Sequence, residues 1–148
     1  EVVHWSQPMI KPAKPGLCAF VCKPFNGVLH FAAQLLLECG NLDVVEFAPT
    51  VQCLDEDYHT ASSDDYPFLD YLLRAKSDAI VYDTILSEEG GRFYFDQNRY
   101  MIVMADDSIP DELPQGFHWI SLSQIQDFIK YGNIINIQAR NLISTIQV

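Results

Sequence analysis

Short apolar runs separated by prolines, glycines and polar turns dominate the first part of the chain. Residues 17–23 and 28–38 are mainly apolar, and Asn26-Gly27 lies between them. This dipeptide is the strongest short signal for a β-hairpin, because both residues tolerate positive φ. A third run, 44–54, contains Pro49, which indicates an edge, a bulge or a bend. The pattern therefore predicts three strands, the first two of them joined as a hairpin.

Later segments carry the period of amphipathic helices: 68–73, 121–130 and 136–146. Pro67 is tolerated in the first turn of the first helix, and Ser121 or Ser123 is the expected N-cap of the second, which Gly132 ends. Two acidic stretches are expected to be surface loops: 55–66 and 106–116. Strands are expected over 79–86, 92–94 and 100–105.

The last two of these strands are predicted to pair as a hairpin around Asp96-Gln97-Asn98. The period of two would then place Arg92 and Tyr94 on a polar face, with Phe93 and Phe95 toward the core. The order of elements predicts an α+β fold with a mixed or antiparallel sheet and flanking helices. A length of 148 residues fits one domain, residues 1–148.

Charge and apolar run lengths narrow the possible partners. The formal net charge of −11 argues against nucleic-acid binding, which needs a basic face, although a few arginines can still hold a nucleotide diphosphate. No apolar run approaches the roughly 20 residues of a membrane span, and no signal peptide is recognisable. The four cysteines are expected to be buried thiols in a reducing compartment, which indicates the cytoplasm. The start at Glu1 suggests a trimmed chain or an excised piece of a longer one.

Several familiar motifs are missing from the sequence. It has no phosphate-binding glycine loop, no G-x-S-x-G and no closely spaced histidine pair. Gly40 and Glu46 have the first spacing of a Nudix box, but residues 54–57 (LDED) stand where the box needs an Arg-Glu pair and a glutamate cluster. We therefore expect no metal site and no magnesium-dependent pyrophosphatase activity.

The densest polar signal is the run 87–94 (SEEGGRFY), followed by 98–100 (NRY). Two glutamates before a double glycine, then arginines and tyrosines, indicate either a ligand pocket or a salt-bridged sheet surface. Gly90-Gly91 would let the backbone approach a ligand closely.

These blocks resemble the NDP-hexose 2,3-dehydratases of deoxysugar biosynthesis. The resemblance extends in order over nearly the whole chain: residues 5–8 (WSQP), Gln34 with Glu38, Gly40-Asn41, 46–52 (EFAPTVQ), 87–94, 98–100 and 136–140 (NIQAR). It implies a Nudix-like fold without Nudix metal chemistry, no cofactor, and one copy of a unit that occurs twice in family members. This copy is most similar to the second. A lone copy is expected to form a homodimer or to pair with another copy.

The resemblance also implies a reaction, the loss of water across C2–C3 of a nucleotide-linked 4-keto-6-deoxyhexose. Such a reaction needs a base for the C3 proton and a donor for the departing hydroxide. Glu89 or Glu88 is the candidate base, and Tyr94 or Tyr100 the candidate donor. Arg92 and Arg99 would bind the diphosphate or the enolate. The alternative is a non-catalytic or repurposed unit that binds nucleotide-sugars, mediates pairing or acts on another β-hydroxy ketone within a larger biosynthetic enzyme.

The remaining candidates would contact the substrate from neighbouring elements: Asn98, Gln34, Glu46, Thr50 and Gln52. Trp5 would stack on a base or sugar, or lie in the core or at its rim. Arg140 would either bind the ligand or hold two elements together.

Overall fold

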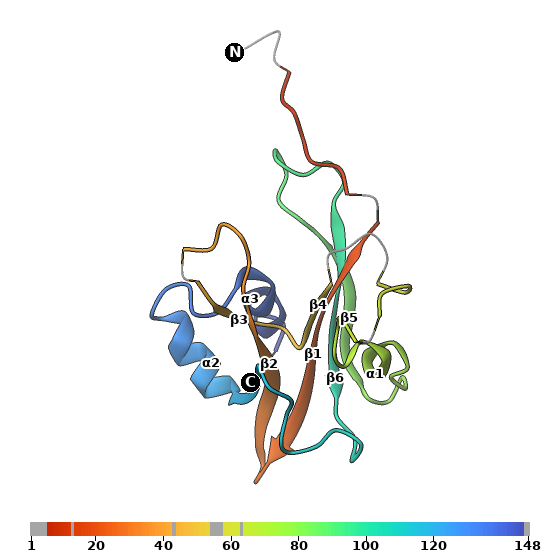
Figure 1. Cartoon of the computed structure of the whole chain (residues 1–148), viewed down its shortest axis with the longest axis vertical. Helices are drawn as coiled ribbons and strands as arrows, with labels where there is room; N and C mark the ends of the chain where they lie inside the picture. Colours follow the sequence, from red (N-terminus) through yellow and green to blue (C-terminus); the bar gives the residue numbers. More distant parts are fainter. Residues whose placement is uncertain (1–5, 13, 43, 54–57, 63, 147–148) are drawn as a thin grey trace.

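The computed structural model describes residues 6–12, 14–42, 44–53, 58–62 and 64–146. Its elements, in chain order, are β1 (Gly16–Phe25), β2 (Val28–Leu36), β3 (Glu46–Ala48), β4 (Val51–Cys53), α1 (Leu69–Leu73), β5 (Ile80–Ser87), β6 (Gln97–Met104), β7 (Phe117–Ser121), α2 (Leu122–Ile129) and α3 (Ile137–Ile143). The strands form one mixed sheet in the order β3-β2-β1-β6-β5 (Figure 1). β4 pairs with β1, and β7 pairs with β2. Only the β1–β6 pairing is parallel among the described strands. The predicted α+β fold is confirmed.

The first part of the chain folds as its pattern predicts. β1 and β2 form a hairpin, and its turn residues Asn26 and Gly27 have φ values of 50° and 80°. The third apolar run bends at Pro49, so that β3 pairs with β2 whereas β4 pairs with β1. One short segment thereby crosses from one strand of the hairpin to the other.

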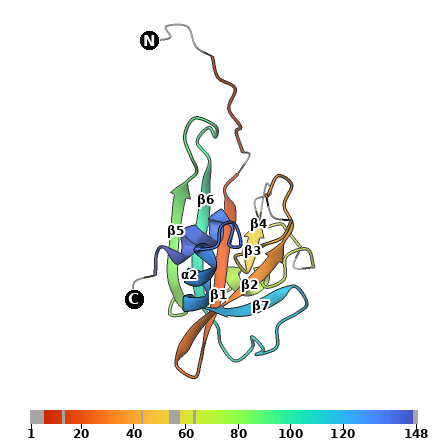
Figure 2. The ribbon, with the colours of Figure 1, turned by 90° about the vertical axis from the view of Figure 1, so that its left-hand side faces the viewer.

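Alternation along β1 divides the core between the two faces of the sheet. Cys18, Phe20 and Cys22 pack with α2 and α3, whereas Leu17 and Val21 pack on the α1 side. Figure 2 shows α2 and α3 covering the first face, and Figure 1 shows α1 across the sheet from them. β6 pairs in parallel register with the central strand β1. Its side chains alternate in the same way, so every second one also faces α3.

Both later helices begin where the sequence places them. Ser121 accepts a hydrogen bond from the backbone N–H of Gln124, whose side chain accepts from the backbone N–H of Ser121, completing a capping box. Asn136 caps α3 by accepting from the N–H of Ala139 over 2.9 Å. Gly132, at φ 97°, follows the end of α2.

The predicted hairpin of residues 92–94 with 100–105 is wrong. β6 pairs instead with β5, in a register that joins Ser87 to Gln97, and residues 88–96 connect the two strands. Phe95 adopts a left-handed φ of 51° and is 85% exposed, so it does not face the core. The 79–86 run offers β6 a partner of its full length, which the shorter 92–94 segment cannot match. Phe93 instead forms a parallel bridge with Ile10 near the start of the chain.

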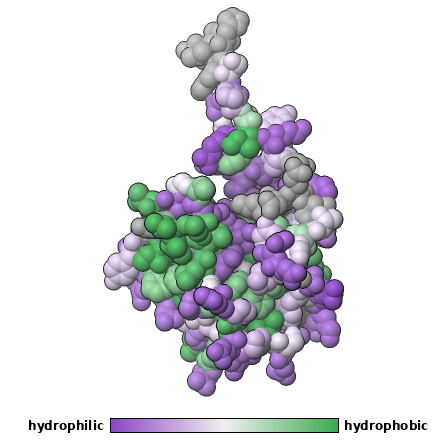
Figure 3. All heavy atoms as spheres, viewed as in Figure 1, coloured by the Kyte–Doolittle hydropathy of each residue, from purple (hydrophilic) through white to green (hydrophobic). Residues whose placement is uncertain are grey.

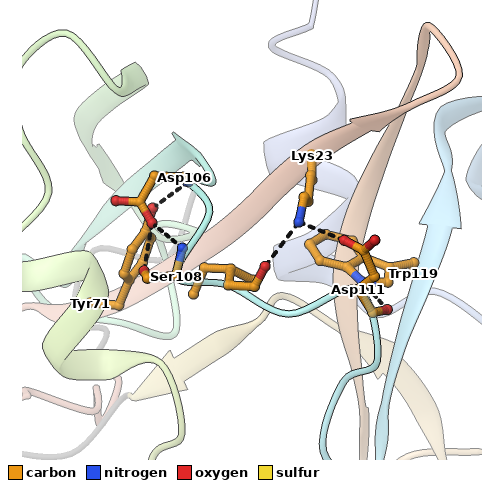
Figure 4. Close-up of polar contacts among 7 residues, drawn as sticks. Lys23, Tyr71, Asp106, Ser108, Asp111 and Trp119 are labelled. Atoms are coloured by element: carbon orange, nitrogen blue, oxygen red, sulfur yellow. Dashed lines mark hydrogen bonds and ion pairs between the residues drawn. The ribbon is translucent and has the colours of Figure 1, made fainter.

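The acidic loop between β6 and β7 is fixed by side chains from three elements (Figure 4). The Nζ of Lys23 donates to the carboxylate of Asp111 over 2.6 Å and to the carbonyl of Ile109 over 2.9 Å. Trp119 donates its indole N–H to the carbonyl of Asp111, and the N–H of Asp106 donates to the hydroxyl of Tyr71. This loop leads into β7, a strand that the sequence pattern did not predict.

The four cysteines are free thiols, of which Cys18, Cys22 and Cys53 are buried. Cys39 is exposed, contrary to expectation, because it lies just beyond the end of β2. No helix in the described part of the chain is long and apolar enough to cross a membrane.

Candidate active site

Glu88 is the centre of a polar network where β5 ends. Its Oε1 accepts hydrogen bonds from the side-chain amide of Asn98 over 2.7 Å and from the hydroxyl of Tyr100 over 3.0 Å. The backbone N–H of Glu88 donates to the carbonyl of Asp96, which closes the loop between the two strands. The carboxylate is therefore held in one position by two donors on the neighbouring strand.

The two donors are themselves fixed by the core. Asn98 is 6% exposed, and its side-chain oxygen accepts from the backbone N–H of Gly16 over 2.7 Å. Tyr100 is 1% exposed and also hydrogen-bonds Asn141 on α3. Burial raises the pKa of the Tyr100 hydroxyl, and the nearby Cys18 and Glu88 add to the rise. Tyr100 therefore stays protonated at neutral pH and donates to Glu88.

A cavity of about 510 Å³ lies against this network. Three parts of the chain supply its walls: the N-terminal segment, the β5–β6 connection and α3. The lining residues are Ile10, Pro12, Lys14, Ser87, Glu88, Glu89, Arg92, Phe93, Asp96, Asn98, Ile137, Gln138 and Asn141. We call this space the Glu88 cavity.

The N-terminal segment is held on the β5–β6 connection by backbone hydrogen bonds. The N–H of Ile10 donates to the carbonyl of Arg92, and the N–H of Tyr94 donates to the carbonyl of Ile10, both over 2.8 Å. The Gln7 side chain also donates to the carbonyl of Gly91. Gly91 has a φ of 88°, a conformation that favours glycine. The segment thus forms one wall of the Glu88 cavity.

The two adjacent glutamates have different surroundings. Glu88 is half-buried, whereas Glu89 is 61% exposed and forms an ion pair of 2.9 Å with Arg92, itself 67% exposed. The Arg92 guanidinium also lies 4.7 Å from the centre of the Phe93 ring. Glu89 and Arg92 therefore lie at the exposed margin of the cavity, and Glu88 lies against its wall.

Asp96 is a cavity residue that the sequence analysis had assigned to a turn. Its carboxyl is half-buried, and burial, with the nearby Glu88 second, raises its pKa. Asp96 belongs to the same polar block as Asn98, two residues away, and that proximity was the signal available in the sequence. Lys14 and Asn141, which also line the cavity, had no comparable signal.

Other predicted site residues lie away from Glu88. Arg99 points to the opposite face of the sheet, where it donates two hydrogen bonds to Asp83 (2.8 and 2.7 Å) and has Tyr58 as a further partner. Tyr94 is exposed, with the Nζ of Lys11 5.9 Å from its ring centre, and it does not line the cavity. Trp5 lies outside the described residues.

Three predicted residues sit in the sheet or beside it. The buried Thr50 hydroxyl accepts from the N–H of Val21 and donates to the carbonyl of Ala32, so it joins β1 to β2. Gln52 donates to Glu38 over 2.8 Å, and its oxygen accepts from Asn136 over 2.7 Å. Gln34 is half-buried on β2, opposite Ala48 and Phe117.

Glu46 and Arg140 line a second, smaller cavity together with residues of the β2–β3 connection. Among the residues that the structure describes, no three His, Cys, Asp or Glu side chains are grouped so as to hold a metal ion.

The site thus combines a fixed carboxylate, a protonated tyrosine and a second carboxyl at one cavity of an α+β unit, an arrangement suited to proton transfer. Comparison with known proteins shows which unit this is. The chain belongs to the NDP-hexose 2,3-dehydratase family, whose model matches residues 1–146.

Curated relatives include dTDP-4-dehydro-6-deoxy-α-D-glucopyranose 2,3-dehydratases of Saccharopolyspora spinosa and Streptomyces violaceoruber. They are 41% and 37% identical over 147 residues, or 99% of this chain. The chain spans only 30% and 33% of the lengths of these relatives.

Solved structures similar to the chain include a T. brucei MERS1–RNA complex, with a TM-score of 0.52 and 9% identity over 83% of this chain and 56% of that one. They also include the M. smegmatis Nudix hydrolase RenU, with a TM-score of 0.49 and 14% identity over 91% and 89% of the two chains. At such identities the likeness concerns the fold alone. The mixed sheet with helices on both faces agrees with the Nudix-like architecture that the family resemblance implied.

Proposed function

We propose that this unit takes part in the 2,3-dehydration of a nucleoside-diphosphate 4-keto-6-deoxyhexose, with the reacting carbons in the Glu88 cavity. The observation that carries the proposal is the Glu88 carboxylate, held by Asn98 and Tyr100 at the wall of a cavity of about 510 Å³. A positioned carboxylate is the group that this reaction needs most. The names of the curated relatives support the same substrate class.

The chemistry requires four proton movements. The C4 ketone acidifies the C3 proton, which Glu88 removes to leave an enolate. The C2–oxygen bond then breaks, and the departing hydroxide takes a proton to become water. The resulting C2–C3 enol gains a proton at C2 and loses one from its oxygen, which gives the 3,4-diketo sugar.

The surrounding residues suit the accompanying roles. Asn98 and Tyr100 are positioning residues, because both are buried and hold the Glu88 carboxylate. Asp96 would assist the departing hydroxide, because its carboxyl lines the same cavity as Glu88. Arg92 would bind the diphosphate at the cavity margin, where its fork of N–H donors can reach solvent. Arg99 and Thr50 would have structural roles, because both are bonded elsewhere.

The proposal is tested by incubating the chain in D₂O with dTDP-4-keto-6-deoxyglucose and following the sugar by NMR and mass spectrometry. The expected product has lost water and carries deuterium at C2, because the enol is protonated there from solvent. Nucleotide-sugar that returns unchanged, although calorimetry shows that it binds, would contradict a catalytic role and favour a binding unit.

A second proposal concerns pairing with another copy of the unit, as a homodimer or within one chain. Between β2 and β3, four apolar side chains are exposed: Leu37 (68%), Leu42 (85%), Val44 (75%) and Val45 (46%). Figure 3 shows apolar residues gathered in this region of the surface. Such a patch favours association.

The cysteines support a further part of the proposal, a reducing, cytoplasmic location. Three of them are buried and none forms a disulfide.

Light scattering at tens of micromolar protein tests the pairing. We expect a dimer, and we expect the double variant L37S/V44S, which leaves the cavity residue Leu42 in place, to be monomeric. The matched control V81S/I85S changes two exposed apolar residues of β5 and should remain dimeric. A monomeric parent chain would contradict self-pairing.

A further inference from the structure

The second cavity, of about 310 Å³, adjoins the Glu88 cavity. Ile137 and Gln138, in the first turn of α3, line both spaces. The remaining wall of the smaller cavity comes from the β2–β3 connection and includes Asn41 and Leu42. A ligand longer than one cavity can therefore pass over the first turn of α3 from one space to the other.

Two hydrogen-bond donors of the smaller cavity, on Asn41 and Arg140, have no acceptor identified among the described residues of the chain. The side-chain Nδ2 of Asn41 is buried and has no hydrogen-bond partner within the described part of the chain. The Arg140 guanidinium forms none of the ion pairs found among the described residues. Native structures rarely leave a buried amide donor unpaired, so such a group points to an acceptor supplied from outside the chain.

The carboxylates of this cavity do not supply that acceptor. Glu38 accepts from Gln52, which is itself bonded to Asn136, the cap of α3. Glu46 is buried and has a partner of its own. The Asn41 amide and the Arg140 guanidinium are both donors, and they suit the carbonyl oxygens of a ligand.

Apolar surface at the same place narrows the class of ligand further. Leu42 and Ile137 line the cavity and are 85% and 58% exposed. A group with flat apolar faces and carbonyl oxygens on its edge fits both the apolar and the donor side chains. A pyrimidine base has this form, whereas a sugar ring presents hydroxyls on all sides.

We propose that Asn41 and Arg140 bind the carbonyl edge of the nucleobase of the ligand whose hexose lies at Glu88. This inference rests on the proposed function, because it assigns the second end of the same substrate. The base lies against Leu42 and Ile137, and the diphosphate crosses the first turn of α3 toward Arg92. Asn41 and Arg140 are substrate-binding residues that act on affinity and not on the proton transfers.

Calorimetric titration of the chain with dTDP and, separately, with inorganic pyrophosphate tests this assignment. N41L keeps the size of the side chain and removes its donors, and R140M does the same for the guanidinium. Each is expected to weaken dTDP binding roughly tenfold, the loss of one good hydrogen bond, and to leave pyrophosphate binding unchanged. The matched control R74M, at the C-cap of α1, should bind dTDP like the parent chain.

Thermal melting separates ligand binding from a structural role. Because N41L removes an unpaired donor, its melting temperature without ligand should equal or exceed that of the parent, whereas the rise on adding dTDP should shrink. A lowered melting temperature without ligand would instead mean that Asn41 holds the fold or a structural water, and would overturn the proposal.

The calorimetric outcomes are equally decisive. Parent-like dTDP affinity in both variants, equal losses for pyrophosphate, or no dTDP binding by the parent at millimolar concentration would each overturn the nucleobase assignment. Weakened dTDP binding in N41L together with full turnover in E88Q would leave this assignment in place and overturn only the proposed role of Glu88.

Discussion

The buried side-chain amide of Asn98 donates a hydrogen bond to the carboxylate of Glu88 over 2.7 Å. The oxygen of the same amide accepts from the backbone N–H of Gly16, at the start of β1. Asn98 therefore connects the candidate base to the central strand of the sheet. Together with Tyr100, Asn98 thus links the position of Glu88 to the parallel pairing of β1 with β6.

Replacing Asn98 by alanine is expected to destabilise the fold. The N–H of Gly16 and one lone pair of Glu88 would lose their partner in a buried place, at a cost of about 1–3 kcal/mol in the free energy of unfolding. Urea denaturation measures this loss. Q97A is the matched control, because Gln97 is the neighbouring, exposed amide of β6. Equal stability of N98A and Q97A would contradict the structural account of Asn98.

Thr50 provides a second test, in which stability and function should separate. T50V keeps the shape of the side chain but removes the hydroxyl that joins Val21 to Ala32, and it should lower the free energy of unfolding by about 1–3 kcal/mol. T50S retains the hydroxyl and should lose much less. If T50V instead folds as stably as the parent but binds nucleotide-sugar more weakly, Thr50 belongs to the ligand site.

The Asp83–Arg99 pair predicts a dependence of stability on pH. The hydrogen bond from Arg99 holds the pKa of the Asp83 carboxyl below its ordinary value. The pair therefore stabilises the fold above the ordinary carboxyl pKa of about 4, and this contribution is lost as the pH falls through the lower pKa of the folded state. Since both side chains are partly exposed, the contribution is about 0.2–1 kcal/mol.

D83N tests this contribution in denaturation series at several pH values. It should lower stability slightly at neutral pH and show a shallower loss of stability below pH of about 4 than the parent chain. Parallel acid profiles for D83N and the parent would mean that the pair contributes nothing.

The elements that the sequence predicted correctly are those with local signals. The Asn26-Gly27 turn, the bend at Pro49 and the caps of α2 and α3 each depend on residues close together in the chain. The wrong hairpin over 92–105 shows the limit of such signals. The pairing of β6 depends on competition between two possible partners, and the left-handed conformation of Phe95 is not encoded in its own type.

The candidate site was predicted as a block of sequence, but not in its arrangement. Ser87, Glu88, Glu89, Arg92, Phe93 and Asn98 of the two blocks line one cavity, whereas Tyr94 and Arg99 lie outside it. Which side of the sheet each residue faces depends on the register of β6, so Asn98 and Tyr100 face α3 whereas Arg99 faces away. Lys14 joins the site through the N-terminal segment, a contact that no local pattern reports.

The two candidate tyrosines should differ sharply in their effect on turnover. Y100F removes the hydroxyl that donates to Glu88, and we expect kcat to fall roughly tenfold while the affinity for nucleotide-sugar changes little. Y94F, at an exposed position outside the cavity, should turn over at the parent rate. Steady-state kinetics of both variants decide between them, and the reverse ranking would contradict the positioning role of Tyr100.

The most direct test compares the two adjacent glutamates by the same kinetics. E88Q keeps the size of the side chain but cannot accept the C3 proton, so kcat should fall by about 10²–10⁴-fold with little change in the affinity for nucleotide-sugar. E89Q should retain most of the turnover, because Glu89 is exposed and paired with Arg92 at the margin. Parent-like turnover in E88Q, with the loss appearing in E89Q or in neither variant, would contradict the assignment of Glu88 as the base.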